Sequence, residues 1–336
     1  MSFGDFKRLL GLRSATDGVG GFSLPAGPEE RRRWLLAGAG MVILFYAYCV
    51  SKTCASGVTP MSLFAWLWLY WGRGSDYAHG YVVPVVAVGL VAWKWKNRLH
   101  SIPLSTASSG LAVILAGVTL YWVGVKSANP RLVAGSLVVL IFGLVLYLAG
   151  WGWAKELWFP CAFLLFMIPL NFLEQYVSFP LRIFVAQVST LLLNILGLDV
   201  FREGTGIYST PNRFLPLEVA DPCSGIRSLM ALMALTSLYG YITMDQSWKK
   251  WVLFLASIPL AVVGNLARIT TVALVAQGFG QDWAMKIYHD YSGYIVFSLA
   301  ILCMIGLGAT LNIHYRELIH RWTQEDVRPP RPVRKR

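Results

Sequence analysis

Charged residues are scarce in this sequence of 336 residues, and their scarcity excludes an ordinary water-soluble protein. Asp, Glu, Lys and Arg make up 14% of the chain and hydrophobic residues make up 56%, whereas soluble domains carry about 25% charged residues. A soluble protein of this length could bury a large core, but it would still need a charged surface to face water. We therefore expect lipid, rather than water, to be the main solvent of the chain.

Cysteine is also rare, which excludes two further classes of protein. The five cysteines, at positions 49, 54, 161, 223 and 303, are too few and too scattered for a disulfide framework. No Cys-x-x-Cys pair and no Cys/His spacing typical of a zinc site occurs in the sequence. We therefore expect neither a bound metal nor another cofactor.

Acidic residues are outnumbered by basic residues, 17 to 29, so that the formal net charge is +12. This excess would suit a nucleic-acid-binding protein, but no separate basic domain is present to bind nucleic acid, and we expect no such partner. The basic residues instead form short clusters at the ends of apolar segments. This distribution is typical of the cytoplasmic flanks of transmembrane helices, and the clusters lie at 31–33, 94–98, 249–250 and 316–336.

Long apolar segments are abundant. A helix needs about 20 mostly apolar residues to cross the hydrocarbon of a bilayer, and eight segments approach this length. They predict an all-α polytopic membrane protein with about eight transmembrane helices: 34–50, 81–95, 110–125, 132–150, 157–170, 226–243, 251–266 and 295–313. The first segment has no small-residue cleavage site after it, so we expect a retained helix rather than a signal peptide.

Three other segments are expected to lie at the membrane surface. Residues 60–71 are aromatic but too short to cross, which favours an interfacial or re-entrant helix. Residues 176–196 are long enough to cross but carry several polar side chains; we favour an amphipathic interfacial helix and keep a crossing helix as the alternative. Residues 199–219 are rich in glycine, proline and β-branched residues, and predict a short extracytoplasmic strand pair.

The basic clusters also predict the orientation of the chain. They place both termini and the 249–250 hairpin in the cytoplasm, so that Cys223, Arg268 and His289 all face the opposite side. The predicted organisation is a cytoplasmic N-terminal segment (1–33), a transmembrane domain (34–315) and a basic cytoplasmic tail (316–336).

Cys223 is the first candidate for chemistry, because it precedes the predicted helix 226–243. The N-terminus of a helix carries unpaired N–H groups and a positive partial charge, which stabilise a thiolate and could hold an oxyanion. Ser224 and Arg227 are candidate supporting residues beside it. A packing role for the cysteine, or a disulfide with Cys49 or Cys54, is the alternative.

Arg268 and His289 are the other two candidates. Arg268 lies near the outer membrane boundary, with Asn265 one turn before it; a boundary arginine suggests function, although snorkelling to the interface is the alternative. His289 can take and give protons near neutral pH, and Asp290 beside it could orient its ring. His79 is a comparable outward-facing histidine, and a structural role is the alternative for both histidines.

The sequences CSGIRS at 223–228, NLARI at 265–269 and HDYSG at 289–293 resemble, in order and spacing, the three motifs of the exosortase/archaeosortase family. The resemblance implies a membrane-embedded cysteine protease and transpeptidase, with Cys223 as the nucleophile that forms an acyl-enzyme. It implies that Arg268 stabilises the thiolate or oxyanion and that His289 is the third catalytic residue, and leaves open which of the two donates a proton.

The same resemblance implies the substrates and the location. Family substrates are secreted proteins with a C-terminal sorting signal: a short motif such as Pro-Glu-Pro, a transmembrane helix and a basic cluster. The implied location is the bacterial inner membrane, among membrane lipids, with the active site facing the periplasm and an unknown acceptor in the cell envelope. The alternatives are a non-catalytic exopolysaccharide export or assembly factor and a small-solute transporter.

Overall fold

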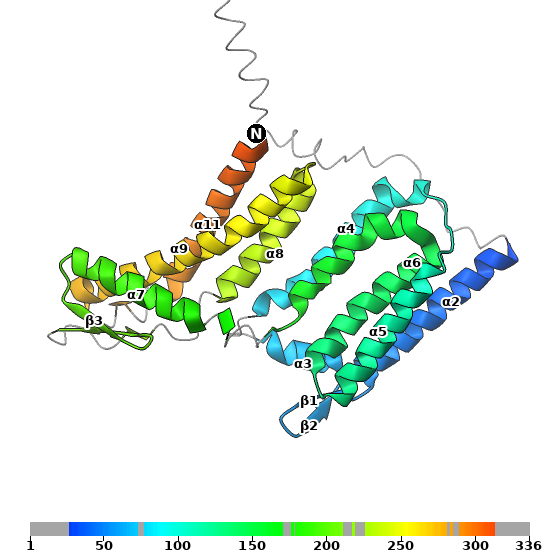
Figure 1. The fold of residues 1–336 in the computed structure, drawn as a ribbon, viewed down its shortest axis with the longest axis horizontal. Helices are drawn as coiled ribbons and strands as arrows, with labels where there is room; N and C mark the ends of the chain where they lie inside the picture. Colours follow the sequence, from blue (N-terminus) through cyan, green and yellow to red (C-terminus); the bar gives the residue numbers. More distant parts are fainter. Residues whose placement is uncertain are drawn as a thin grey trace, which may run out of the picture. The chain divides into compact units, whose positions relative to one another are not determined.

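The structure is a computed structural model that describes residues 27–72, 77–170, 176–177, 179–210, 217–218, 226–280, 283–284 and 289–312. At positions 29–30, 217–218, 226–227 and 289–290 it describes the backbone only. The chain divides into two compact units, Met1–Asn171 and Phe172–Arg336, whose helices and strands are coloured along the sequence in Figure 1.

The first unit is made mainly of apolar helices. Its elements are α2 (Pro28–Phe45), η1 (Tyr46–Val50), β1 (Cys54–Ser56), β2 (Thr59–Met61), α3 (Leu63–Tyr70), η2 (Ala78–Tyr81), α4 (Val82–Asn97), η3 (Leu99–Ser101), α5 (Ser109–Lys126), α6 (Pro130–Phe163) and η4 (Leu164–Met167). Helix α3 corresponds to the aromatic segment that the sequence predicts as a short helix. The hairpin of β1 and β2, which pair antiparallel, is not predicted by the sequence.

Three glycines spaced seven residues apart let α5 pack directly against α6. A Cβ atom at Gly110, Gly117 or Gly124 would lie between 2.4 and 2.8 Å from the nearest atom of α6. Gly110 faces Tyr147 whereas Gly124 faces Val133, so the two helices run antiparallel. Close approach through small residues is a common way for helices to associate in lipid, where no hydrophobic effect drives them together.

Helix α6 reverses its direction at Gly150. This residue has φ 83° and ψ −177°, and a Cβ there would lie 2.1 Å from Oγ of Ser105, so only glycine fits. Arg131 Nε donates a hydrogen bond to the carbonyl of Pro169 over 3.0 Å, whereas a straight helix would separate these residues by about 57 Å. The segment is therefore a helical hairpin, and it contains two of the eight predicted membrane helices.

The second part of α6 begins earlier than the sequence predicts, because residues 151–156 are helical and not a connection. Glu156 lies in this part and forms an ion pair with Lys94 of α4, with Arg98 Nη1 3.7 Å from its other oxygen. Lys94 is only 6% exposed, and a buried charge must be paired. A second buried polar contact joins η1 to α6, where Tyr48 Oη lies 2.7 Å from Ser136 Oγ.

The second unit combines helices with a small sheet. Its elements are α7 (Phe179–Ile195), β3 (Val200–Glu203), β4 (Gly206–Ser209), β5 (Leu217–Glu218), α8 (Ile226–Thr243), α9 (Ser247–Phe279) and α11 (His289–Asn312). The strand pair expected within 199–219 is present as β3 and β4, and β5 extends it to an antiparallel sheet of order β3-β4-β5.

Helix α9 is the axis of this unit. Every fourth residue from Leu253 to Ile269 is buried, and Leu253 and Ala261 of this buried stripe pack against α8 and α11. Ala261, in the middle of the stripe, packs with Leu232 of α8 and Ala300 of α11. Helix α9 has 33 residues and is therefore about 50 Å long, which exceeds the predicted segment 251–266 at both ends.

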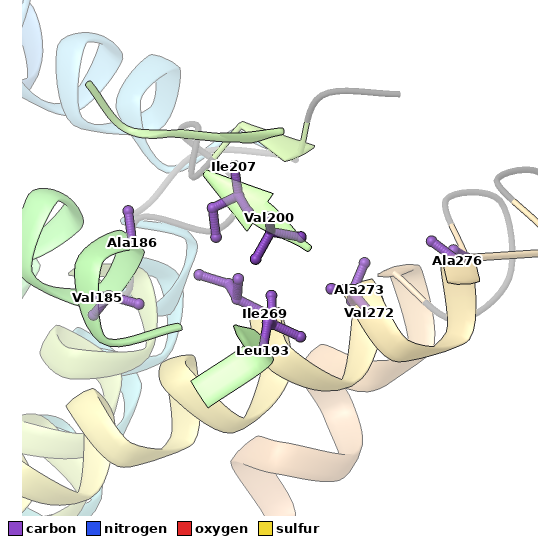
Figure 2. Close-up of a cluster of buried hydrophobic side chains, with 10 residues drawn as sticks. Val185, Ala186, Leu193, Val200, Ile207, Ile269, Val272, Ala273 and Ala276 are labelled. Carbon is purple, nitrogen blue, oxygen red and sulfur yellow. The ribbon is translucent and has the colours of Figure 1, made fainter. Parts of the chain in front are cut away.

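The C-terminal half of α9 packs against α7 and the sheet, as Figure 2 shows. This contact explains why the helix continues past the predicted end near Leu266. Asn194 ties α7 to β3, because its Nδ2 donates to the carbonyl of Val200 and its Oδ1 accepts from the N–H of the same residue. The buried residues of the cluster are Val185, Ala186, Leu193, Val200, Ile207, Ile269, Val272, Ala273, Ala276 and Ala284.

Six helical segments within the described residues are long and apolar enough to cross a membrane. They are Arg31–Val50, Ala78–Asn97, Ser109–Lys126, Pro130–Met167, Ser247–Phe279 and Tyr291–Asn312. The fourth is the helical hairpin, and α8 and α7 are shorter apolar helices. The predicted class, an all-α polytopic membrane protein, is confirmed. Whether the chain crosses eight times, and whether α7 lies at the interface, stay predictions.

The glycine contacts of α5 predict a specific loss of stability. We expect Gly110→Ala to destabilise the protein by about 1–3 kcal/mol, because the added methyl group would collide with the α6 backbone. Gly89→Ala in α4 is the matched control: no atom lies within 4 Å of its Cβ position, and alanine favours helix by about 0.5–1 kcal/mol. Thermal unfolding of the two variants in detergent measures the difference; equal melting temperatures would contradict the packing described here.

Candidate functional site

The predicted site residues fall in both units. Cys223 and Ser224 lie outside the described residues, and so do the side chains of Arg227, His289 and Asp290. Asn265 and Arg268 are described in full on α9 of the second unit, whereas His79 belongs to the first unit.

Arg268 is held against the first turn of α11. Its Nε donates a hydrogen bond to Oγ of Ser292 over 3.2 Å, and Ser292 is only 1% exposed. A Cβ atom at Gly293 would lie 3.6 Å from Cζ and Nη2 of Arg268, so the guanidinium rests on the bare backbone of that glycine. The contacts between α9 and the start of α11 thus fix the position of the Arg268 guanidinium.

Ser292 is the residue that the sequence analysis does not single out. It lies within the HDYSG sequence, three residues after His289, and the spacing of three places the two positions on one side of a helix. The spacing could have identified Ser292 as a site residue only if the segment had been predicted to be helical. The sequence analysis places His289 just before the last helix, whereas its backbone forms the first residue of α11.

Asn265 lies one turn before Arg268 and is 6% exposed. It belongs to the buried stripe of α9, and its Nδ2 makes no hydrogen bond among the described residues. Next to it, Gly264 brings α9 close to α11, because a Cβ there would lie 2.9 Å from Cγ1 of Val296.

The first turn of α8 lies at the same level. Leu232 of α8 packs beside Ala261 of α9, and a Cβ at Gly240 would lie 3.6 Å from the Cα of Lys250. The helices therefore run antiparallel, and this register places Ile226, where α8 begins, beside the turn of α9 that carries Asn265 and Arg268.

His79 is packed within the first unit. Both ring nitrogens are buried and neither makes a well-aligned hydrogen bond, although the backbone of Phe166 is near. The neighbouring Gly80 touches Trp71 so closely that a Cβ would lie 2.1 Å from the indole Nε1, and that nitrogen donates to the carbonyl of Met167. The structure gives His79 dense surroundings and places it in a different unit from the other candidates.

The other four cysteines lie outside the predicted site. Cys49, Cys54, Cys161 and Cys303 are all free. Cys54 lies outside the candidate membrane spans, and burial raises the pKa of its thiol, which disfavours the reactive thiolate. Within the described part of the chain, no group of three His, Cys, Asp or Glu residues could hold a metal ion.

This arrangement is suited to holding negative charge. A half-buried guanidinium, a buried amide donor and the first turns of two helices converge on one region of the second unit. Guanidinium groups and helix N-termini both favour anions. The chemistry that such a region can perform is the stabilisation of a thiolate or of an oxyanion that develops on a carbonyl.

The contact between Arg268 and Ser292 predicts energetic coupling between α9 and α11. A hydrogen bond to a charged group contributes about 1.5–3 kcal/mol. We therefore expect Arg268→Gln and Ser292→Ala each to lower the free energy of unfolding by most of the amount that the double variant lowers it. A double-mutant cycle on unfolding in detergent measures this coupling. Thr271→Val is the control partner, since its hydroxyl bonds carbonyls of its own helix; additive losses for Arg268 and Ser292 would contradict the contact.

A family model that describes transmembrane exosortases matches residues 71–306. The match covers more than two thirds of the chain and spans positions 223, 268 and 289. No curated protein and no solved structure matches the chain. With its apolar helices and this match, the chain is a multi-pass membrane protein that belongs to the transmembrane exosortase family.

Proposed function

We propose that the protein is a membrane cysteine protease and transpeptidase that processes C-terminal sorting signals of secreted proteins. The observation that carries the proposal is the position of Arg268, fixed by Ser292 and Gly293 on the first turn of α11. His289 is the first residue of that helix, and helical spacing puts position 289 on the same side of α11 as positions 292 and 293.

Covalent geometry supports Cys223 as the third member. It lies three positions before Ile226, so the two Cα atoms are at most about 11 Å apart. Because Ile226 begins α8 beside the turn of Asn265 and Arg268, a residue at position 223 is within covalent reach of that region of the second unit. A cysteine just before a helix is also placed to gain from the partial positive charge of the helix N-terminus.

The proposed reaction uses these groups in turn. The Cys223 thiolate, whose proton is held on His289, attacks the carbonyl carbon of the scissile peptide, and the π electron pair moves to oxygen. When the oxyanion collapses, the C–N bond breaks and the leaving amine takes the proton from the His289 imidazolium, leaving a thioester. An envelope acceptor then gives its proton to His289 and attacks the thioester carbon, which releases the thiolate.

Arg268 suits the electrostatic role in this scheme. A guanidinium stays protonated at any pH at which the protein works, so it stabilises negative charge on sulfur or oxygen but is a poor proton donor. An imidazole exchanges protons near neutral pH. We therefore assign the proton transfers to His289 and the charge stabilisation to Arg268.

The proposed setting follows from the family and the charge distribution. The chain lies in the inner membrane, surrounded by lipid, with its site on the periplasmic side, where secreted substrates arrive. Residues 34–315 form the catalytic membrane domain, with cytoplasmic segments at 1–33 and 316–336. Ser224, Arg227 and Asp290 support the site or contact substrate.

Substitution of the nucleophile tests the proposal. We expect Cys223→Ser to slow processing of a co-expressed sorting-signal substrate by at least about 10³-fold, because a hydroxyl has no comparable anionic form at neutral pH. Immunoblotting for the uncleaved substrate measures the effect, with enzyme abundance in the membrane as a check. Cys303→Ser, which changes an exposed free thiol on α11, is the matched control. Full processing by an abundant Cys223→Ser enzyme would disprove the mechanism.

A further inference from the structure

The side-chain amide of Asn265 is buried without using its donors. The residue is 6% exposed, and its Nδ2 makes no hydrogen bond among the described residues. Buried polar groups in proteins are nearly always paired, because an unpaired donor loses its water without compensation. A donor kept in this state requires an explanation.

Packing of the neighbouring positions does not call for an amide, because the described contacts of Ala261 and Gly264 are made with apolar residues. Asn265 lies on the buried stripe between Ala261, which packs against α8 and α11, and Ile269, which packs against α7 and the sheet. Its neighbour Gly264 is in close contact with Val296 of α11. Leucine or alanine at position 265 would continue the apolar stripe without an unpaired donor.

Three other buried polar atoms of this unit also make no hydrogen bond among the described residues: the hydroxyls of Ser189 and Thr270, and Nε of Arg182, whose guanidinium has other interactions. The two hydroxyls differ from Asn265 in chemistry. A hydroxyl has one hydrogen that rotates freely and can turn to a carbonyl of its own helix. An amide has two donors fixed in a plane, so its direction is set by the side chain and it needs a partner in front of it.

The position of Asn265 indicates what that partner is. Asn265 and Arg268 are three residues apart on α9, and such residues are neighbours on a helix surface. The first turn of α8, three residues after Cys223, lies at the same level. A carbonyl group attacked by the Cys223 thiolate would therefore develop its negative charge in the region between Asn265 and Arg268.

We propose that Asn265 is a substrate-binding residue whose side-chain amide donates a hydrogen bond to the carbonyl oxygen of the scissile peptide and to the oxyanion formed from it. This inference rests on the proposed function and deepens it. As the thiolate adds to the carbonyl carbon, the π pair moves to the oxygen that the amide holds. When that pair returns, the C–N bond breaks and the amine leaves with the proton from His289. Asn265 itself exchanges no proton.

This role gives an unusual combination of effects for Asn265→Leu. Loss of one donor to a developing oxyanion slows an enzyme by about 10²–10³-fold, and we expect this loss of processing rate. Removal of an unpaired buried donor leaves the melting temperature equal to or above that of the parent. The alkylation rate of Cys223 by N-ethylmaleimide also stays unchanged, because a donor to the substrate carbonyl does not act on the thiolate.

The experiment uses the full-length protein in membranes with a co-expressed sorting-signal substrate. Alkylation is read in a parent whose other four cysteines are replaced by serine. Thr270→Val, which removes an unpaired hydroxyl from the same helix without changing its shape, is the matched control and should process at the parent's rate. Asn265→Ala repeats the test without any risk of overpacking, in case leucine disturbs insertion.

The outcomes separate this inference from the proposed function. Processing by Asn265→Leu and Asn265→Ala within about threefold of the parent, while Cys223→Ser is inactive, overturns the role of Asn265 and leaves the mechanism standing. A lower melting temperature and slower alkylation in both Asn265 variants assign a structural role and also overturn it. Processing that survives Cys223→Ser removes the mechanism on which the inference rests.

Discussion

The interior of a bilayer offers no hydrogen-bonding partner, so each polar group carried into the helices must be satisfied by the chain itself or reserved for a ligand. Lys94 and Glu156 of the first unit are satisfied in the former way, by their ion pair. In the second unit, Arg268 is anchored by Ser292, but the amide of Asn265 is not satisfied in this way. Paired groups such as Lys94 and Arg268 stabilise the fold, whereas the amide of Asn265 keeps its donors available for a ligand.

The apolar segments were predictable because hydropathy is a local property of the sequence. Where the prediction failed, the cause was a contact between distant segments. Residues 151–156 carry charges that suggest a connection, yet Glu156 is accommodated in a helix because Lys94 of α4 lies opposite. Helix α9 continues past Leu266 because α7 and the sheet cover its C-terminal half. Neither the partner nor its register can be read from one segment alone.

For the candidate site, the CSGIRS, NLARI and HDYSG sequences were predicted as functional segments, and their polar residues interrupt otherwise apolar surroundings. Their catalytic roles stay predictions. Ser292 was missed because its role depends on how α9 and α11 are aligned, which fixes it opposite Arg268. His79 was predicted from its residue type and its outward-facing position; it belongs to the first unit, and its role stays a prediction.

The length of α9 has a consequence for the lipid environment. Lys250 and Arg268 are 18 positions apart on one helix, a rise of about 27 Å, close to the thickness of the hydrocarbon layer at about 30 Å. The two cations thus bracket a segment of α9 that is about as long as the hydrocarbon layer is thick. In a bilayer of longer acyl chains, hydrophobic mismatch would draw either Lys250 or Arg268 below the headgroups, or reduce the tilt of the helix from the bilayer normal. Acyl-chain length is therefore expected to tune the exposure of the guanidinium to the aqueous phase, so that membrane composition becomes a determinant of activity.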